Sequence, residues 1–312
     1  MAQSETTLLQ IDKPEEEGLV AFLRKIPMAV VRFGVRKPLG GVSLVVLFLM
    51  IFISIFAPYI APHDPYELDF MAIQEAPGRY ILGTDATGRD VLSRIIYGGR
   101  ISVLVGFLSV GIGTMGGALL GVASGYLSGK FDLVSQRFIE ILLSFPGIIL
   151  ALILLAAFGM GMIPTIAAIA ITRLPQSTRV IRSVALSVRE FDYVTAARAV
   201  GASDTRIMLR HVLPQCVAPI LIVASAHLGI AIIIEASLGF LGVGIPAPTP
   251  TWGNMVGDRS VTITLFPPWW LVVFPGIPIF MIVLAFNLFG DALRDVLDPR
   301  LRGSESVRQT QA

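Results

Sequence analysis

Five long apolar segments dominate this chain, and four of them contain no charged residue. They cover 40–60, 101–129, 141–172, 216–241 and 270–289, and only the fourth holds a charge, at Glu235. A run of about 20 apolar residues is long enough to cross the hydrocarbon core of a bilayer as a helix. With 54% hydrophobic and 15% charged residues, the chain of 312 residues is too apolar for a soluble domain. The sequence therefore predicts an all-α, polytopic membrane protein.

The segment 141–172 is too long for one span, and the stretch Gly159–Pro164 divides it. We therefore expect two spans joined by a tight external turn, which brings the predicted total to six transmembrane helices. Proline should disturb two of them, because it lacks a backbone N–H and clashes with the preceding turn. Pro146 is expected to kink the third helix, and Pro275-Gly276 with Pro278 is expected to break the sixth.

Basic residues set the predicted orientation. Six of them precede the first apolar segment, and the positive-inside rule places that end of the chain in the cytoplasm. Arg173, Arg179 and Arg182 should lie at the cytoplasmic end of the fourth span, and further arginines occur up to 210 and from 294 onward. With six spans, both termini are cytoplasmic and 61–100 is the first external loop. The glycine-rich segment 101–129 should pack closely against other helices.

The sequence divides into four predicted parts. Residues 1–38 form a cytoplasmic segment with an amphipathic helix, for which a simple juxtamembrane linker is the alternative. Residues 39–100 hold the first transmembrane helix, predicted as an uncleaved signal anchor, and an external loop. Residues 101–295 form the core transmembrane domain with a cytoplasmic loop at 185–214. Residues 296–312 form a cytoplasmic tail.

The loop 185–214 is the longest polar stretch between two apolar regions, and its pattern predicts two short helices. The first begins with acids near Glu190 and is stopped by Gly201. Ser203 or Asp204 can cap the second, whose apolar residues keep helical spacing until Pro214. Alanines in the first helix permit close approach to another surface. An ordinary cytoplasmic helical hairpin is the alternative interpretation.

The spacing of Ala196-Ala197, Gly201 and Leu213-Pro214 resembles the "EAA" loop of ABC-importer permeases. In that family the loop is a coupling helix that sits in a cleft of the ATPase subunit. The resemblance implies that an ATPase contacts six residues of this chain: Thr195, Ala196, Ala197, Gly201, Leu213 and Pro214. Thr195 stands where glutamate is usual, and His211 stands where isoleucine is usual.

Residues 82–100 strongly resemble the LGTDxxGRDVxSRxxYGxR signature of dipeptide, oligopeptide and nickel importer permeases. The glycines do not make a phosphate loop, because no strand precedes them and no Gly-Lys-Ser follows. The acids fit a calcium loop poorly. We expect instead a turn that caps a short helix with its apolar side in 91–96. The signature residues of this external loop are Gly83, Asp85, Gly88, Arg89 and Asp90.

Three later stretches also resemble family segments. They are 235–242 (EAxLSFLGLG), 248–253 (PPTPxWG) and 286–300 (NLxGDxLRDxLDPR). The proline-rich loop 244–268 is expected either to dock a solute-binding protein or to pack as a lid on the helix ends. Its tryptophans fit an interfacial belt; they are Trp252, Trp269 and Trp270.

Glu235 lies inside the fifth span, two turns after His227. An acid at membrane depth is costly and is by default a functional candidate, here on the translocation path. The alternative is a structural hydrogen bond to a neighbouring helix. The resemblance favours the structural role, because the EAxLSFLGLG stretch is shared whatever the solute.

Over 82–302, the resemblance implies the second permease (DppC/OppC type) of a peptide-class ABC importer. It implies the type I importer permease fold and a bacterial or archaeal cytoplasmic membrane. The implied partners are a related second permease in a heterodimer, two ABC ATPase subunits, an extracytoplasmic solute-binding protein and lipid. No Walker loop is present, so ATP and Mg²⁺ are expected on the ATPases, with no catalytic role and no cofactor in this chain.

Other partners and sites are disfavoured by the residues themselves. Three separated histidines and the single Cys216 predict no metal site. A net charge of +2 is too small to indicate nucleic acid. No nucleophile–base pair at membrane depth points to an enzyme.

The rival function is a self-contained secondary transporter or channel that uses Glu235 and His227 as an ion or proton relay. Such a protein needs several buried ionisable residues that face one path, and the sequence offers only this pair. The solute stays open among dipeptides, longer peptides, glutathione, nickel chelates and sugars.

Overall fold

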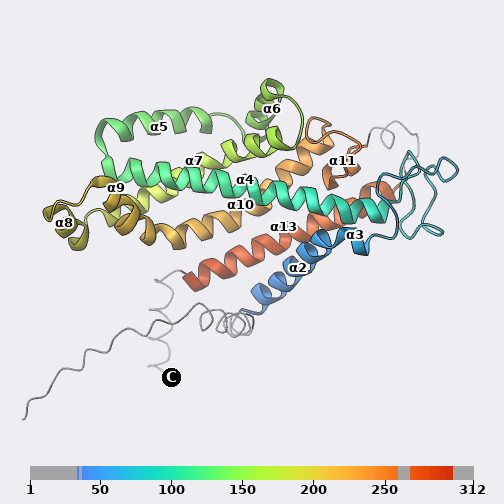
Figure 1. Ribbon diagram of the computed structural model, residues 1–312, viewed down its shortest axis with the longest axis horizontal. Coiled ribbons are helices and arrows are strands. Elements are labelled where there is room, and N and C mark those ends of the chain that lie inside the picture. Colours follow the sequence, from blue (N-terminus) through green and yellow to red (C-terminus); the bar gives the residue numbers. More distant parts are fainter. Residues whose placement is uncertain (1–33, 35–36, 259–267, 298–312) are drawn as a thin grey trace, which may run out of the picture.

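The computed structural model describes residues 34, 37–258 and 268–297. The predicted N-terminal amphipathic helix, the C-terminal tail and part of the proline-rich loop lie outside the described residues. The described chain is a bundle of long helices that run roughly side by side (Figure 1). Its one β feature in these ranges is an isolated bridge between Thr84 and Asp90.

The described helices follow one another with short connections, apart from the loop at 61–90 before α4 and the loop at 241–251 before α11. In order they are α2 (Pro38–Ile55), α3 (Ala57–Ile60), α4 (Val91–Leu127), α5 (Gly129–Leu143), α6 (Gly147–Phe158), α7 (Met162–Val188), α8 (Asp192–Ala199), α9 (Asp204–Ile207), α10 (Val217–Phe240), α11 (Trp252–Val256) and α13 (Trp270–Leu297). A π-helical turn (Met208–Val212) and a 3-10 turn (Leu213–Cys216) join α9 to α10.

Four helical stretches of the described chain are long and apolar enough to cross a membrane: α2, α4, Asp204–Phe240 and α13. The pair α5 and α6 makes a fifth if it counts as one bent span, since the two meet at 93°. The prediction of an all-α membrane protein is therefore confirmed, whereas six transmembrane helices are not confirmed. The difference arises at α7, which contains Arg173, Arg179 and Arg182 within its length and continues beyond them to Val188.

Several helices are longer than the sequence indicated. The predicted short helix at 91–96 and the span that follows it form the single helix α4. Pro275 and Pro278 do not break α13, because both lie within one continuous helix. Pro214 does not end the second hairpin helix, since the π and 3-10 turns carry the chain past a residue without an N–H.

Two predicted spans are instead divided into separate helices. The first apolar segment does not form one helix to residue 60, because α2 ends at Ile55 and the short α3 follows. Pro146 does more than kink the third span: it precedes a separate helix, α6. The tight turn expected at 159–164 is confirmed, because α6 ends at Phe158 and α7 begins at Met162.

α4 and α7 lie so close together that four glycines of α4 touch the backbone of α7. The glycines recur every four residues and so share one face of the helix. A Cβ atom on each would come within 2.5–2.8 Å of a carbonyl oxygen: Gly113 with Ala170, Gly117 with Leu174, Gly121 with Thr178 and Gly125 with Arg182. We call this contact the glycine seam. Small residues allow such close packing between membrane helices, as the sequence predicted.

The bundle has two distinct ends (Figure 1). α8 and α9 project at one end, which we call the hairpin end, and residues 61–90 lie at the other, which we call the loop end. Lys37, before α2, pairs with Asp295, near the end of α13, at 2.7 Å. This ion pair joins the first and last long helices of the described chain on the side away from the loop end.

Large apolar side chains cover much of the outer surface of the bundle. Phe48 on α2 is 70% exposed and Phe280 on α13 is 67% exposed. Exposed apolar surface of this extent is typical of a protein that faces lipid or other subunits. The interior, by contrast, is filled by three main clusters of buried aliphatic residues that lie between the long helices.

Candidate functional site: a helical hairpin and a polar cluster at opposite ends

The α8–α9 hairpin is a compact turn of two short helices. α8 ends where Gly201 adopts φ +81°, a left-handed conformation that glycine adopts without steric cost. The Gly201 amide donates to the Arg198 carbonyl at 3.0 Å, and the Ala202 amide donates to the Ala197 carbonyl at 3.1 Å. This pair of bonds is a Schellman motif, which satisfies the last carbonyls of α8. The predicted helix stop at Gly201 is confirmed.

Three buried aliphatic residues anchor the hairpin to the bundle. Val194 on α8, Ile207 on α9 and Val212 in the π turn are fully buried. They pack in one cluster with residues of α4 and α7, including Val122 and Ile181. The hairpin is therefore attached to the same two helices that the glycine seam joins.

A tyrosine at the end of α4 adds polar contacts to this anchor. The Tyr126 hydroxyl donates to Asp204 Oδ1 at 2.8 Å, and the Arg198 guanidinium lies 5.5 Å from the centre of the Tyr126 ring. Asp204 is the first residue of α9 and Arg198 lies in the last turn of α8, so one side chain of α4 contacts both arms of the hairpin. Ser203 occupies the N-cap position as predicted, but its side chain makes no capping hydrogen bond.

The predicted coupling residues lie on or beside the exposed side of the hairpin. Thr195, Ala196 and Gly201 are exposed, and Ala197 is half-buried. Leu213 packs against the anchoring cluster, and Pro214 is exposed beyond it. The structure thus exposes Thr195, Ala196 and Gly201 on the hairpin, whereas Ala197 packs against the anchoring cluster. Leu213 and Pro214 lie on the helix that leads into the bundle.

The exposed side of the hairpin also presents apolar groups. Val200, beside Gly201, is 84% exposed, and Tyr193 is 41% exposed. A polar cavity of about 370 Å³ opens next to them, with Arg189 and Thr195 among its lining residues. Exposed apolar side chains beside polar groups are typical of a protein–protein contact. The arrangement can therefore act as a rigid contact element.

A bidentate ion pair joins three helices just behind the hairpin. Arg182 on α7 donates from Nε and Nη2 to the two carboxylate oxygens of Asp132 on α5, each at 2.6 Å. Ser124 on α4 donates to the same carboxylate. Sequence analysis missed this pair and the Tyr126 contacts, because both join residues that are far apart along the chain. Polar residues at the end of an otherwise apolar span were the available signal.

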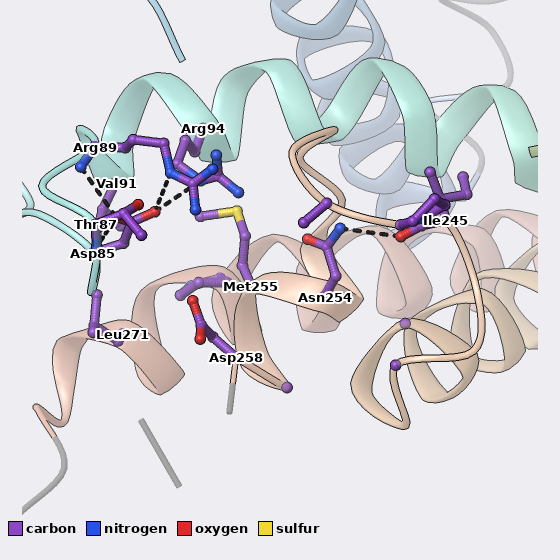
Figure 2. A pocket seen from close by; sticks show the side chains of 16 residues that line it. Asp85, Thr87, Arg89, Val91, Arg94, Ile245, Asn254, Met255, Asp258 and Leu271 are labelled. Carbon is purple, nitrogen blue, oxygen red and sulfur yellow. Dashed lines mark hydrogen bonds and ion pairs between the residues drawn. The ribbon is translucent and has the colours of Figure 1, made fainter. Parts of the chain in front are cut away.

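At the loop end, a buried acid organises the predicted signature (Figure 2). Asp85 accepts from Arg89 Nε at 2.9 Å, and Arg94 Nε lies 3.3 Å from the same carboxylate oxygen. The Thr87 hydroxyl donates to the other oxygen at 2.7 Å. Burial raises the pKa of Asp85, but the Thr87 hydrogen bond and the charge of Arg94 outweigh this, so the pKa lies below its ordinary value.

The other signature residues have local structural roles. Asp90 caps α4, because its side chain accepts from the Ser93 amide at 2.9 Å, which confirms the predicted cap. Gly83 and Gly88 both have positive φ, at 78° and 80°. A Cβ on Gly88 would overlap the carbonyl of Asp69. The signature therefore folds the loop onto the end of α4.

A cavity of about 390 Å³ lies between this cluster and the end of α10. Arg89, Arg94 and Asp258 contribute charged groups to its wall, while Met255 and Leu271 contribute apolar ones (Figure 2). The cavity at the loop end is thus lined mainly by apolar groups, with charged groups on one side, and the proline-rich loop forms part of its wall.

The described part of that loop packs as a lid. Trp252 is 3% exposed, and its indole N–H donates to the carbonyl of Ile95 at 2.9 Å. Trp252 therefore lies inside the bundle, and its predicted place in an interfacial belt is wrong. Glycines on both sides allow this close approach, since a Cβ on Gly239 would lie 2.8 Å from the Asn254 amide.

Glu235 is buried beneath this lid, at 2% exposure. Its hydrogen-bonding neighbours are Ser102 on α4 and Thr251 at the start of α11. Within the described structure, its Oε2 atom has no hydrogen-bond partner. His227 lies eight residues earlier on the same helix, about 12 Å away along the axis, and contacts Ser177 at 3.5 Å. Glu235 thus lies between α4, α10 and the start of α11, one helix segment away from His227.

The described chain is thus a helical membrane protein. It carries an exposed hairpin at one end and a buried polar cluster at the other. Within the described ranges, no group of three or more His, Cys, Asp or Glu side chains is placed to hold a metal ion. The chain belongs to the family of binding-protein-dependent transport system inner membrane components, whose model matches residues 117–303. The N-terminal transmembrane domain of oligopeptide transport permease C matches residues 29–77.

Named relatives agree with this family. A di/tripeptide transport system permease protein DppC of Pseudomonas aeruginosa is 41% identical, over 86% of this chain and 90% of its own length. A probable D,D-dipeptide transport system permease protein DdpC of Escherichia coli is 40% identical, over 86% of this chain and 90% of its own. A glutathione transport system permease protein GsiD of Pectobacterium atrosepticum is 40% identical, over 81% and 84%.

Proposed function

We propose that this chain is one of two permease subunits of an ATP-driven importer of short peptides, and that the α8–α9 hairpin transmits the work of ATP hydrolysis. The observation that carries the proposal is the attachment of the hairpin. Val194, Ile207 and the Tyr126 contacts hold it to α4 and α7, while Ala196 and Gly201 remain exposed. Such an element is rigid, exposes small residues and is attached to two long helices, and these properties suit the transmission of force.

In this proposal the hairpin sits in a cleft of an ABC ATPase subunit. Closure of two ATPases on ATP draws the hairpins of two permeases together, and the glycine seam makes α4 and α7 follow. ATP and Mg²⁺ are held by the ATPases, so this chain is the moving part and not an enzyme. The second permease is a related chain, which gives a heterodimer with a path between the two subunits.

The proposed orientation places the hairpin end in the cytoplasm, with both termini on the same side. The arginines of α7 and the hairpin support this orientation by the positive-inside rule. We propose six spans in the type I importer fold, with α7 as a full span and α5–α6 as a broken one. The glycine seam supports this count, because it holds α7 alongside α4, which is itself long enough to span.

The loop end then faces outward and receives cargo from a solute-binding protein. Three relatives are named for di- and tripeptides, D,D-dipeptides and glutathione, all of which are short peptides with a free carboxylate. Short peptides are therefore the proposed cargo class. The rival relay through Glu235 and His227 gains no support, because some 12 Å of helix separates the two residues.

A substitution at Gly201 tests the coupling role. Both Asn and Asp tolerate a left-handed backbone, and a Cβ at this position meets no atom within 4 Å. Gly201→Asn therefore controls for the backbone, while Gly201→Asp adds a negative charge to the exposed side of the hairpin. We expect the assembled transporter with Gly201→Asp to hydrolyse ATP without peptide uptake in proteoliposomes, and Gly201→Asn to retain most uptake. Full uptake by the Gly201→Asp variant would falsify the coupling role.

A further inference from the structure

Arg173 is a buried cation in the middle of α7 without an acidic partner in the described chain. It is 7% exposed, and its Nε donates to the Thr172 hydroxyl at 3.3 Å. None of the ion pairs among the described residues includes Arg173, whereas Arg182, two to three turns later, is held by Asp132. Eleven residues separate Arg173 from the start of α7, which is about 17 Å of helix and so close to half the thickness of a bilayer core. A buried charge without a counter-charge is costly.

The guanidinium of Arg173 points at the start of α6. A Cβ on Gly147, the first residue of α6, would lie 3.0 Å from Arg173 Nη2. No side chain caps this helix end. The first helical hydrogen bond runs from the Leu150 amide to the Pro146 carbonyl at 3.0 Å. The amides of 147–149 therefore have no partner within the helix, and they point out of its positive end.

The bend before α6 lies at the surface of the single chain. Residues 144–146, at the bend between α5 and α6, are exposed. A positive helix end and a guanidinium that face each other repel, unless an anion lies between them. Backbone amides at a helix start and an arginine fork are both suited to a carboxylate or phosphate group. The guanidinium and the helix start together offer the donors that an anion site needs.

An exposed polar stripe on α7 leads away from this site. Gln176, Arg179, Ser183 and Ser187 recur at helical spacing, and all four are exposed in the single chain. Polar side chains at membrane depth face water or another subunit rather than lipid. A groove of about 480 Å³ between α7 and α10 begins at this stripe and reaches His227.

We infer that Arg173 and the free amides at the start of α6 form a carboxylate-binding site on the transport path, which takes the carboxylate of a peptide cargo as it passes. The inference rests on the proposed function and adds to it a named position for cargo contact. An arginine binds a carboxylate with two parallel hydrogen bonds, whereas the helix amides contribute without adding a formal charge. A phosphate headgroup of an anionic lipid has the same chemistry, so the experiment must separate the two sources.

The test measures binding of alanyl-alanine and of its C-terminal amide to the assembled transporter without the binding protein, in phosphatidylcholine nanodiscs. Saturation-transfer NMR detects weak binding of both compounds. We expect alanyl-alanine to bind about tenfold or more tightly than the amide, because a charge-assisted hydrogen bond is lost in the amide. Arg173→Gln should remove this difference, and Arg173→Lys should keep part of it. Arg137→Gln is the matched control, because Arg137 is exposed and pairs with Glu140.

Four outcomes would overturn the inference. Equal binding of the acid and the amide by the wild-type transporter excludes a carboxylate site, as does the absence of any signal. An acid preference that persists in Arg173→Gln places the site elsewhere. Loss of alanyl-alanine binding when phosphatidylglycerol is added identifies a lipid headgroup site instead. The proposed function fails separately, if wild-type transporter shows no ATP-dependent peptide uptake in proteoliposomes.

Folding of the variant is checked independently of binding. Arg173→Gln should assemble with its partner subunits and hydrolyse ATP, because an uncharged side chain relieves a buried charge. A variant that fails to assemble is replaced by Arg173→Cys in a Cys216→Ser background. Modification with aminoethyl methanethiosulfonate restores a positive charge there, and methyl methanethiosulfonate does not. Acid preference restored by both reagents or by neither contradicts the inference.

Discussion

Tyr126 is the residue whose single hydroxyl joins the bundle to the hairpin. Tyr126→Phe removes the hydrogen bond to Asp204 and keeps the ring beneath Arg198. A hydrogen bond of this kind contributes about 1 kcal/mol, so we expect amide hydrogen exchange in 192–207 to accelerate about fivefold. Peptide uptake per ATP hydrolysed should fall. Tyr59→Phe is the control, since Tyr59 is 87% exposed at the other end of the bundle.

Unchanged exchange in Tyr126→Phe would mean that the buried aliphatic anchors hold the hairpin without help. Val194 and Ile207 would then carry the whole attachment. The uptake measurement distinguishes a role in stabilising the hairpin from a role in coupling. If exchange accelerates but uptake per ATP is unchanged, Tyr126 has only the stabilising role.

Asp85 makes the stability of the loop end dependent on pH. Its pKa in the folded chain lies below the ordinary value, so the ionised carboxylate stabilises the fold above about pH 4. That contribution is lost as the pH falls through the folded pKa. Asp85→Asn leaves two buried arginines without their acid, and we expect a loss of about 3 kcal/mol at neutral pH.

The measurement for Asp85 is the midpoint of thermal unfolding between pH 7 and pH 3. The gap between wild type and Asp85→Asn should be largest at pH 7 and should narrow below about pH 4. Glu67→Gln, at an exposed acid of the same loop, should shift the midpoint little at any pH. A gap that stays constant down to pH 3 would exclude Asp85 as the titrating group.

At the level of elements, the glycine seam is predicted to tolerate no added methyl group. Gly117→Ala would bring a Cβ to 2.6 Å from the Leu174 carbonyl oxygen, which is backbone and cannot turn aside. We expect a loss of about 1–3 kcal/mol from this overpacking. Gly111→Ala is the matched control in the same helix, where the new Cβ meets nothing within 4 Å. Equal thermal midpoints for the two variants would contradict the seam as a tight contact.

The sequence predicted elements where the signal is local. Gly201 stops α8 because a left-handed residue is needed there, and Asp90 caps α4 through its near neighbour Ser93. Prediction from the sequence failed for helix ends at prolines, where tertiary packing overrides the local preference. Pro214, Pro275 and Pro278 all lie within continuous helical stretches, because surrounding helices hold the chain in register.

The same division applies to the candidate site. The exposed positions of Thr195, Ala196 and Gly201 followed from a motif within a few residues. The contact of Tyr126 with Asp204 joins residues 78 positions apart, and that of Arg173 with the start of α6 depends on the bend at Pro146. Neither contact produces a periodic pattern of residues that could be recognised in a single sequence.

For the whole molecule, the proposed orientation predicts opposite labelling of the two ends. Cys216 is buried, so a Cys216→Ser background carries single cysteines at Met71 (96% exposed, loop end) or Val200 (84% exposed, hairpin end). A membrane-impermeant thiol reagent applied outside should label Met71→Cys in intact cells. Val200→Cys should react only after the membrane is opened. Labelling of both from outside would contradict the proposed number of spans.

The spacing of the glycine seam limits how the chain can move. Each contact repeats after four residues, so sliding of α4 along α7 by less than a full repeat would drive side chains into carbonyls. The two helices can tilt together but cannot slip past each other. A small displacement of the hairpin end is then transmitted to the loop end, because α4 and α7 move as one body. In the proposed mechanism, movement of the hairpin and opening at the loop end would therefore occur together.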